Sequence, residues 1–274
     1  MPGIRWTGKA IPFVKASACG NDFLLIDSRE IEGRIAASEM AAFSRKICDR
    51  QYGVGADGVE WMFPHHTADL EIRLINGDGS EAEISGNGTR CVAAYLCQSE
   101  GKERILLQTG AGLKTCVLVG RNDVEYEFET GMGQARVGAE LAIKLTEGEF
   151  LGIPVSMGNP HYVLFVERFA KDWQARARAI QRSAEFKQGV NIEMVVVDGR
   201  HDLQARFLER GAGETQSSGT GSCAAAVAAV STGRAEFPVR VHAPGGAQVV
   251  SQKNQAVTLS GPARIICRGE YFPG

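Results

Sequence analysis

Residues 69–91 read DLEIRLINGDGSEAEISGNGTRC, and the same pattern returns at residues 202–224 as DLQARFLERGAGETQSSGTGSCA. The two segments align without a gap at an offset of 133 residues (202 − 69), with seven identities over 23 positions. Three of the identities are two turn glycines and one loop serine, which is Ser85 in the first copy and Ser218 in the second. A repeat of this kind indicates that one structural unit occurs twice.

Other paired segments support the duplication, because they follow the same order in both halves. Gly20-Asn21 opens GNDFLLID, and Gly158-Asn159 opens GNPHYVLFV. Gly53-Val54 precedes ADGVEWM, and Gly189-Val190 precedes NIEMVVV. A chain of 274 residues is long enough for two domains. We predict an N-terminal domain at residues 1–135, completed by a C-terminal strand at 265–274, and a second domain at 136–264.

Each copy shows short apolar runs that predict strands, followed by a glycine-rich loop and a helix. In the first copy the helix follows Ser85 and ends at about Gln98, with Gly101 as its stop signal. In the second copy Ser218 precedes the alanine-rich helix CAAAVAAV, whose small side chains indicate tight enclosure. We therefore predict an α+β fold in which each domain is a curved, mostly antiparallel sheet around a central helix. The predicted strands are 23–27, 59–63, 70–75, 114–120 and 124–129 in the first copy, and 162–166, 192–197, 203–208, 238–243, 248–251 and 256–260 in the second.

Composition argues against several classes of protein. The net charge of −2 and pI near 6.2 give no basic surface for nucleic acid or for an anionic membrane. No apolar run approaches the roughly 18 residues that cross a bilayer, and the N-terminus lacks a signal-peptide core. Seven cysteines form no CxxC pair, which argues against a zinc site and a disulfide framework. We expect a cytoplasmic protein in a reducing compartment.

The two loop serines lie where chemistry on an anionic substrate is possible. Both Ser85 and Ser218 precede predicted helix N-termini, where free N–H groups and the helix dipole favour an anion. If the two domains pack about a pseudo-twofold axis, the loops face each other across a cleft. A carboxylate held there would present opposite faces of its neighbouring carbon to two side chains, which is the geometry of two-base proton transfer. Either serine alone would more often be a simple helix N-cap.

Six long motifs, found in the same order along nearly the whole chain, resemble those of the diaminopimelate epimerase family. They are ACGNDFLLID (18–27), YGVGADG (52–58), NGDGSEAEISGNGTRC (76–91), VSMGNPHYV (155–163), FKQGVNIE (186–193) and ERGAGETQSSGTGSCAA (209–225). The resemblance implies two similar domains with the active site in the cleft between them. It also implies an amino-acid isomerase that uses neither pyridoxal phosphate nor a metal, and that forms a homodimer.

The same resemblance implies a substrate site, residue by residue. Arg210, with Asn76 and Asn191, would hold the distal amino-acid end, a role that suits the planar guanidinium fork. Glu209 would bind the substrate ammonium, and the two helix N-termini would bind the reacting carboxylate. The matching positions are Asn21, Asn76, Gly86, Asn87, Asn159, Asn191, Glu209, Arg210, Gly219 and Thr220, with His161 beside the reacting centre.

The chain departs from the family pattern at the two reacting groups. The family motifs carry cysteines as acid and base, whereas here those positions are Ser85 and Ser218. A thiol has a pKa near 8.5 that falls further at a helix N-terminus. A serine hydroxyl is a far weaker acid and needs an adjacent base. Serine is nearly isosteric with cysteine, so we expect fold and binding to be preserved.

Three interpretations of this double departure stay open. The chain is a working epimerase whose hydroxyls are assisted by His161 or Glu209, an inactive or engineered form that traps or only binds the ligand, or a related racemase or dehydratase. Retention of Asn76, Asn191 and Arg210 favours a substrate with a second amino-acid group. We therefore expect an epimerase of the lysine and cell-wall pathway that interconverts LL- and meso-diaminopimelate, with Ser85 and Ser218 as its reacting groups.

Overall fold

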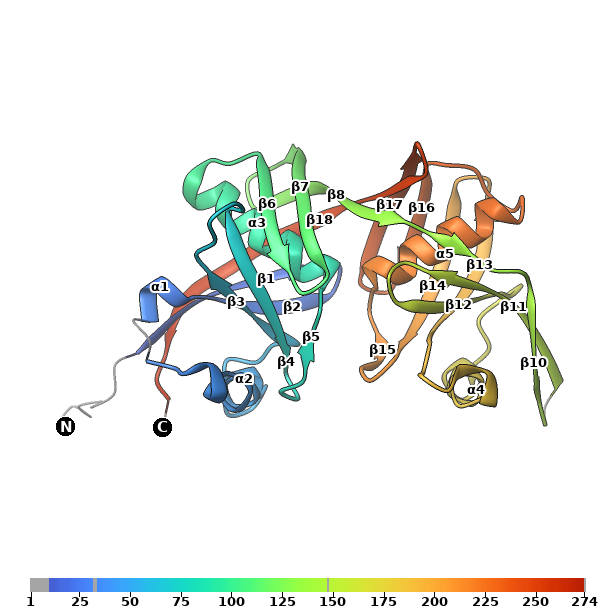
Figure 1. The fold of residues 1–274 in the computed structure, drawn as a ribbon, viewed down its shortest axis with the longest axis horizontal. Coiled ribbons are helices and arrows are strands. Elements are labelled where there is room, and N and C mark those ends of the chain that lie inside the picture. Colours follow the sequence, from blue (N-terminus) through green and yellow to red (C-terminus); the bar gives the residue numbers. More distant parts are fainter. Residues whose placement is uncertain (1–9, 32–33, 147, 274) are drawn as a thin grey trace. The chain divides into compact units, whose positions relative to one another are not determined.

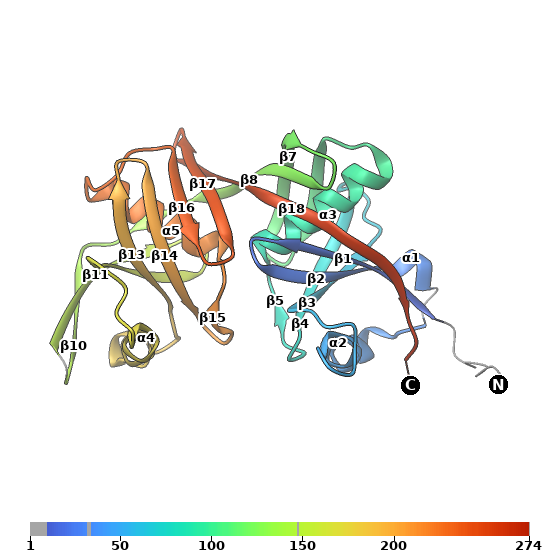
Figure 2. The ribbon, with the colours of Figure 1, turned by 180° about the vertical axis from the view of Figure 1, so that it is seen from behind.

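The computed structural model describes residues 10–31, 34–146 and 148–273, which form two compact units (Figures 1 and 2). Unit 1 comprises the chain up to Tyr126 together with Ala263 onward, and unit 2 spans Glu127–Pro262. The division falls within two long strands, β8 (Glu125–Gln134) and β18 (Ala256–Tyr271). Among the described residues, no helix has the length and apolar character needed to cross a membrane.

Unit 1 surrounds the helix α3 (Gly86–Glu100) with strands. The pairs β2–β3 and β4–β6 are parallel, and the pairs β1–β2, β3–β4, β6–β7 and β1–β18 are antiparallel. Figure 2 shows β18 running along β1. The remaining strands of unit 1 are β1 (Ile11–Ala18), β2 (Asn21–Asp27), β3 (Gly58–Phe63), β4 (Leu70–Asn76), β5 (Glu81–Ala82), β6 (Arg104–Thr109) and β7 (Gly112–Arg121). Its shorter helices are α1 (Ser28–Ile31), a 3-10 turn (Ala37–Glu39) and α2 (Met40–Cys48).

Unit 2 repeats this arrangement around the helix α5 (Gly219–Ser231). Its parallel pairs are β12–β13 and β14–β16, and the antiparallel pairs include β11–β12, β13–β14, β16–β17 and β17–β18. The strands are β9 (Arg136–Val137), β10 (Leu141–Leu145), β11 (Gly148–Ser156), β12 (Pro160–Phe165), β13 (Asn191–Gly199), β14 (Asp202–Glu209), β15 (Gly213–Thr215), β16 (Val239–Ala243) and β17 (Gly246–Lys253). The helices are α4 (Trp173–Gln181), α5 and a 3-10 turn (Ala184–Phe186).

The alanine-rich sequence of α5 is explained by its enclosure. Residues 223–226, 228 and 229 of this helix are fully buried within the core of unit 2. A helix that is apolar on all sides must be covered on all sides, and only small side chains allow strands to approach so closely. The predicted fold, a sheet around a central helix in each of two copies, is confirmed.

Strand register gives the equivalent positions of the two units. In unit 1, Phe23 pairs with Gly58 between β2 and β3, and in unit 2 His161 pairs with Asn191 between β12 and β13. The aromatic ring of Phe23 therefore occupies the position that His161 occupies in the second copy.

The next pair of strands fixes a second equivalence. Glu60 of β3 pairs with Leu74 of β4, and Glu193 of β13 pairs with Phe207 of β14. The two glutamates lie 133 residues apart in the sequence (193 − 60), which is the offset of the sequence repeat. Each unit thus carries one glutamate at the same place in an otherwise apolar strand.

Candidate active site

Ser85 is the N-cap of α3 and is half-buried. Its backbone is extended (φ −122°, ψ 122°), and its Oγ accepts a hydrogen bond of 3.0 Å from the N–H of Gly88. Its carbonyl accepts the N–H of Thr89 at 2.8 Å. The first N–H groups of a helix have no partner within the helix, so Ser85 satisfies one of them. The hydroxyl is fixed at the positive end of α3.

Ser218 has the same role in unit 2, and it is buried. Its Oγ accepts the N–H of Gly221 at 3.1 Å, again from an extended residue that caps the helix (φ −139°, ψ 126°). Burial raises the pKa of Glu209, and the Ser218 side chain opposes that rise. The Glu209 carboxyl therefore lies near the Ser218 hydroxyl.

His161 links two further groups to this end of α5. Its Nδ1 lies 2.7 Å from Glu193 Oε1, and its Nε2 lies 2.9 Å from Asn159 Oδ1. Asn159 Nδ2 donates to Thr220 Oγ1 at 3.4 Å, so the oxygen of the Asn159 amide faces the ring. The ring nitrogen Nε2 must then carry a hydrogen.

The other ring nitrogen of His161, Nδ1, pairs with Glu193. Both side chains are buried, and burial raises the pKa of Glu193 while His161 opposes the rise. We call Asn159, His161, Glu193, Glu209, Ser218 and Thr220 the Ser218 cluster. It contains five of the residues predicted from the sequence, together with Glu193.

In unit 1 the amides of Asn87 and Asn21 are held in one chain of hydrogen bonds. Asn87 Nδ2 donates to Asn21 Oδ1 at 2.6 Å, and Asn21 Nδ2 donates to Asp57 Oδ2 at 3.1 Å. The buried guanidinium of Arg90 donates to Asn87 Oδ1. Asp57 in turn accepts from Arg50 at 2.8 Å. The first turn of α3 is therefore held by polar contacts, whereas that of α5 leads into a helix of small apolar residues.

The predicted distal residues lie in two places. In unit 2, Asn191 Oδ1 accepts the backbone N–H of Arg210 at 2.8 Å, so Asn191 fixes the backbone that carries this arginine. The Arg210 side chain is exposed, and its Nη1 donates to the carbonyl of Gln188 at 3.0 Å. Asn76 belongs to unit 1, where its Nδ2 donates to Ser80 Oγ at 3.0 Å. The structure thus joins Asn191 to Arg210, and it describes Asn76 within the other unit.

Cys91 and Cys223 do not offer a substitute for the missing thiols. Both lie in the central helices and are fully buried, and burial raises the pKa of the Cys91 thiol. Buried thiols of this kind are unreactive. Across the described ranges, no group of three His, Cys, Asp or Glu side chains is placed to hold a metal ion.

Glu60 was not predicted from the sequence as a site residue. Its side chain is 1% exposed, and neither carboxyl oxygen has a hydrogen-bond partner within the described part of the chain. Burial raises its pKa to about 8. The carboxyl group lies against Gly88, where any Cβ would overlap it. The signal for it was a single acidic residue in the apolar run GVEWMF, at the repeat offset from Glu193.

We predict that Glu60→Leu stabilises the protein, and more so at high pH. The folded-state pKa of about 8 lies above the ordinary value of 4.5, so folding holds this carboxyl neutral while the unfolded chain ionises. The free-energy penalty of burying the Glu60 carboxyl is absent below its pKa in the unfolded chain. This penalty grows as pH rises and levels off above the pKa of the group in the folded protein. Denaturation between pH 5 and 8 should show the gain increasing by about 1 kcal/mol per pH unit.

The matched control for this stability effect is Glu81→Gln, at an exposed carboxylate of β5. It should shift the unfolding free energy by less than about 0.5 kcal/mol at every pH. A Glu60→Leu gain that does not change with pH would contradict the assignment of a neutral buried carboxyl.

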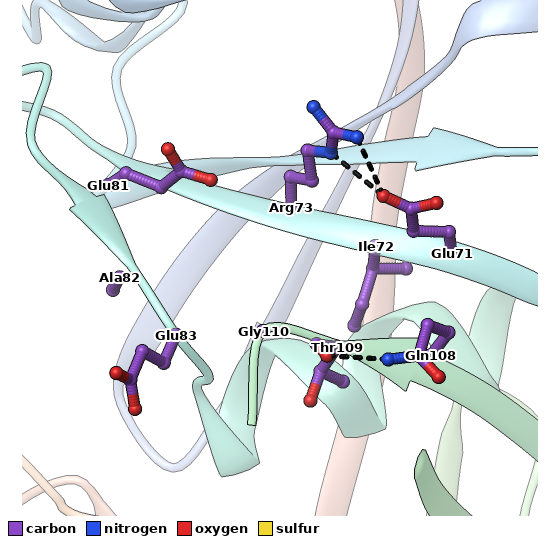
Figure 3. Close-up of a pocket in the computed structure, with 9 residues that line it drawn as sticks. All are labelled: Glu71, Ile72, Arg73, Glu81, Ala82, Glu83, Gln108, Thr109 and Gly110. Carbon is purple, nitrogen blue, oxygen red and sulfur yellow. Dashed lines mark hydrogen bonds and ion pairs between the residues drawn. The ribbon is translucent and has the colours of Figure 1, made fainter. Parts of the chain in front are cut away.

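A hollow of about 380 Å³ lies beside the strand that leads to Ser85 (Figure 3). Arg73 and Glu71 form an ion pair of 2.8 Å on one side of the hollow. Glu81 of β5 and Glu83, which follows that strand, also line it. None of the residues predicted for the substrate site lines this hollow. It is a feature of unit 1 separate from the helix N-terminus.

Solved structures show which group of proteins shares this fold. A hydroxyproline epimerase from Agrobacterium vitis, with bound trans-4-hydroxy-L-proline, matches with a TM-score of 0.71 at 16% identity, over 98% of this chain and 92% of that one. A phenazine biosynthesis protein of the PhzF family from Bacillus anthracis matches with a TM-score of 0.72 at 16% identity, over 96% and 99%. Both matches, at 16% identity, show a shared fold.

Sequence relatives narrow this to one family. Residues 13–137 and 153–266 match the family model described as diaminopimelate epimerase. The diaminopimelate epimerase of Desulfitobacterium hafniense is 36% identical over 274 residues, covering 93% of this chain and 96% of the relative. That of Pelotomaculum thermopropionicum is 36% identical over 276 residues, covering 94% and 98%. The chain belongs to the diaminopimelate epimerase family, and its predicted family is confirmed.

Proposed function

We propose that this protein is an isomerase that interconverts LL- and meso-diaminopimelate by removing and returning a proton at one α-carbon, without pyridoxal phosphate or metal. The observation that carries the proposal is the pair of serine hydroxyls that cap α3 and α5 at equivalent positions, with the Glu209 carboxyl near Ser218. Family membership supplies the substrate class.

The proposed reaction uses one hydroxyl on each face of the α-carbon. In one direction Ser218 Oγ takes the α-proton while its own proton passes to Glu209, and Ser85 delivers a proton to the opposite face. The two helix N-termini hold the reacting carboxylate and stabilise the negative charge that develops on it. Transfer by positioned acid and base groups of this kind accelerates reactions by about 10²–10⁴-fold.

The other members of the Ser218 cluster act as positioning residues in this proposal. His161 holds the Asn159 amide, and Asn159 holds Thr220 in the first turn of α5. The Glu193–His161 pair lies close enough to Glu209 to influence its protonation, since Glu193 raises and His161 lowers the Glu209 pKa. The proposal places Asn21 and Asn87 in the same role for α3, through their mutual hydrogen bond.

We predict that Arg210→Ala weakens diaminopimelate binding by about 10²-fold, because charge-assisted hydrogen bonds to a carboxylate are worth about 1.5–3 kcal/mol. The Arg210 side chain is exposed, so its removal should leave the fold intact. Isothermal titration calorimetry measures the effect. The matched control is Arg200→Ala, at an exposed arginine that pairs with Glu236. Equal binding by both variants would contradict the role of Arg210 at the distal end of the substrate.

A second candidate function is binding of the same ligand without turnover. The observation that favours it is the pair of hydroxyls where the family resemblance calls for thiols. The binder and the isomerase share Arg210 and both helix N-termini, so binding alone does not separate them. A racemase of smaller amino acids, the third possibility, would not require Arg210.

The proposal is tested by incubating purified protein with LL-diaminopimelate and resolving the stereoisomers by chiral chromatography. We expect meso-diaminopimelate to appear at a rate proportional to protein concentration, with no loss after treatment with a chelator or a carbonyl reagent. Tight binding without product identifies a binder, and loss of activity on either treatment contradicts the cofactor-free chemistry.

The expected homodimer is a prediction that sedimentation analysis tests.

A further inference from the structure

The buried carboxyl of Glu60 lies at the N-terminus of α3, a helix of 15 residues. It contacts Gly88, the same residue whose N–H donates to Ser85 Oγ at 3.0 Å. The strand residues in register with it, Leu25 and Leu74, are apolar and buried. On α3 the titratable neighbour is the buried thiol of Cys91. No structural contact in the described part of unit 1 accounts for an acidic side chain here, since neither oxygen has a partner.

Comparison with unit 2 shows what is missing around Glu60. There the equivalent Glu193 pairs with His161, but the position of His161 is taken by Phe23 in unit 1. In unit 2 the base of Ser218 is Glu209, but the residue at the repeat offset (209 − 133 = 76) is Asn76, an amide that does not accept a proton. Ser85 thus lacks the equivalents of both Glu209 and His161.

Glu60 is the one carboxyl group of the repeat that unit 1 retains at its helix N-terminus. We propose that Glu60 is the proton-holding partner of Ser85, a positioning residue that supplies and receives the proton of this hydroxyl during the reaction. The inference rests on the proposed function and names the residue that makes a serine workable on the unit 1 side. Gly88 allows it, because any side chain at that position would occupy the place of the carboxyl.

The proton balance is complete without any other reactant. Ser85 Oγ–H delivers its proton to the α-carbon, and the neutral Glu60 carboxyl, which is not hydrogen-bonded to Ser85 in the structure, turns toward this hydroxyl. The O–H proton of Glu60 then replaces the one delivered, which leaves Glu60 as a carboxylate. On the opposite face the α-proton moves to Ser218 Oγ, whose own proton moves to Glu209. The reverse reaction returns both protons. Each turnover therefore requires Glu60 protonated and Glu209 ionised, or the converse, and solvent exchange resets the pair.

The first test is Glu60→Gln, which keeps the shape and removes the titratable carboxyl proton. We expect kcat to fall about 10²-fold or more, with the dissociation constant of diaminopimelate unchanged, and the alkaline limb of the kcat–pH profile to disappear. Glu60→Leu should show the same loss in a protein that is at least as stable. Wild-type kcat and pH profile in both variants would overturn the proposal. If the glutamine variant does not fold, the leucine variant decides.

A second test needs no turnover, which separates this inference from the proposed function. In protein labelled with carbon-13 at glutamate carboxyls, the Glu60 signal is assigned by its absence in Glu60→Gln and titrated by NMR. Ser85→Ala should raise its midpoint, because the ionised carboxylate loses the hydroxyl dipole that lies across Gly88. Ser218→Ala, the matched cap removal on α5, should leave it unchanged. An unchanged midpoint in Ser85→Ala overturns the pairing. A shifted midpoint in a protein without epimerase activity retains the pairing and rejects the proposed function.

Discussion

Ser218→Ala should lower kcat for diaminopimelate epimerisation by about 10³-fold, within the range that a positioned acid–base group contributes. The Ser218 hydroxyl caps α5 at Gly221 and lies near Glu209. Alanine removes the group that takes the α-proton in the proposed reaction. The helix N–H groups that hold the reacting carboxylate remain, so the dissociation constant should change by less than about threefold. Steady-state kinetics together with calorimetry measure the two quantities separately.

The control for this variant must account for the lost helix cap, which costs about 1 kcal/mol. Ser231→Ala removes a hydroxyl from the other end of the same helix, where it donates to the carbonyl of Ala228 at 3.0 Å. We expect it to retain wild-type kcat. A Ser218→Ala variant that binds the ligand and turns over at the wild-type rate would show that this hydroxyl is only a cap.

Replacing both hydroxyls with thiols should raise kcat by about 10²-fold, since a thiol at a helix N-terminus is a far stronger acid than an alcohol. In Ser85→Cys/Ser218→Cys, both sulfur atoms would occupy N-cap positions beside the N–H groups of Gly88 and Gly221. The alkaline part of the pH profile should then report thiol ionisation. Fold and ligand binding should be retained, because the two side chains are nearly the same shape.

The matched control is Ser99→Cys/Ser231→Cys, which places two thiols elsewhere on the same two helices. This protein should keep the wild-type rate. If the N-cap double variant binds diaminopimelate but gains no activity over wild type, Ser85 and Ser218 are not the positions of the reacting groups.

The duplicated fold was predictable from the sequence because turn chemistry repeats with it. Glycines and the cap serine recur where the chain must turn and start a helix, as in Ser85-Gly86 and Ser218-Gly219. The enclosure of α5 was predictable from its alanines, because a helix that is apolar on all sides must be covered on all sides. Strands such as β10 and β11 gave no clear periodic signal, although they pair with each other and β11 also pairs with β9 and β12.

The residues of the candidate site that belong to a sequence motif were predictable. The residues whose role depends on a contact between distant parts of the chain were not. Glu209 and His161 were predicted to assist the hydroxyls, but the sequence does not show that Glu209 lies near Ser218. Glu60 looked like one polar residue on a strand. Its burial against Gly88 becomes visible only when β3 and α3 are placed together.

Proton transfer at the α-carbon is tested most directly by NMR of LL-diaminopimelate in heavy water with the wild-type protein, which follows the α-protons. We predict that deuterium enters at one α-carbon and that the configuration of that carbon inverts. Tight binding with no deuterium incorporation would contradict it.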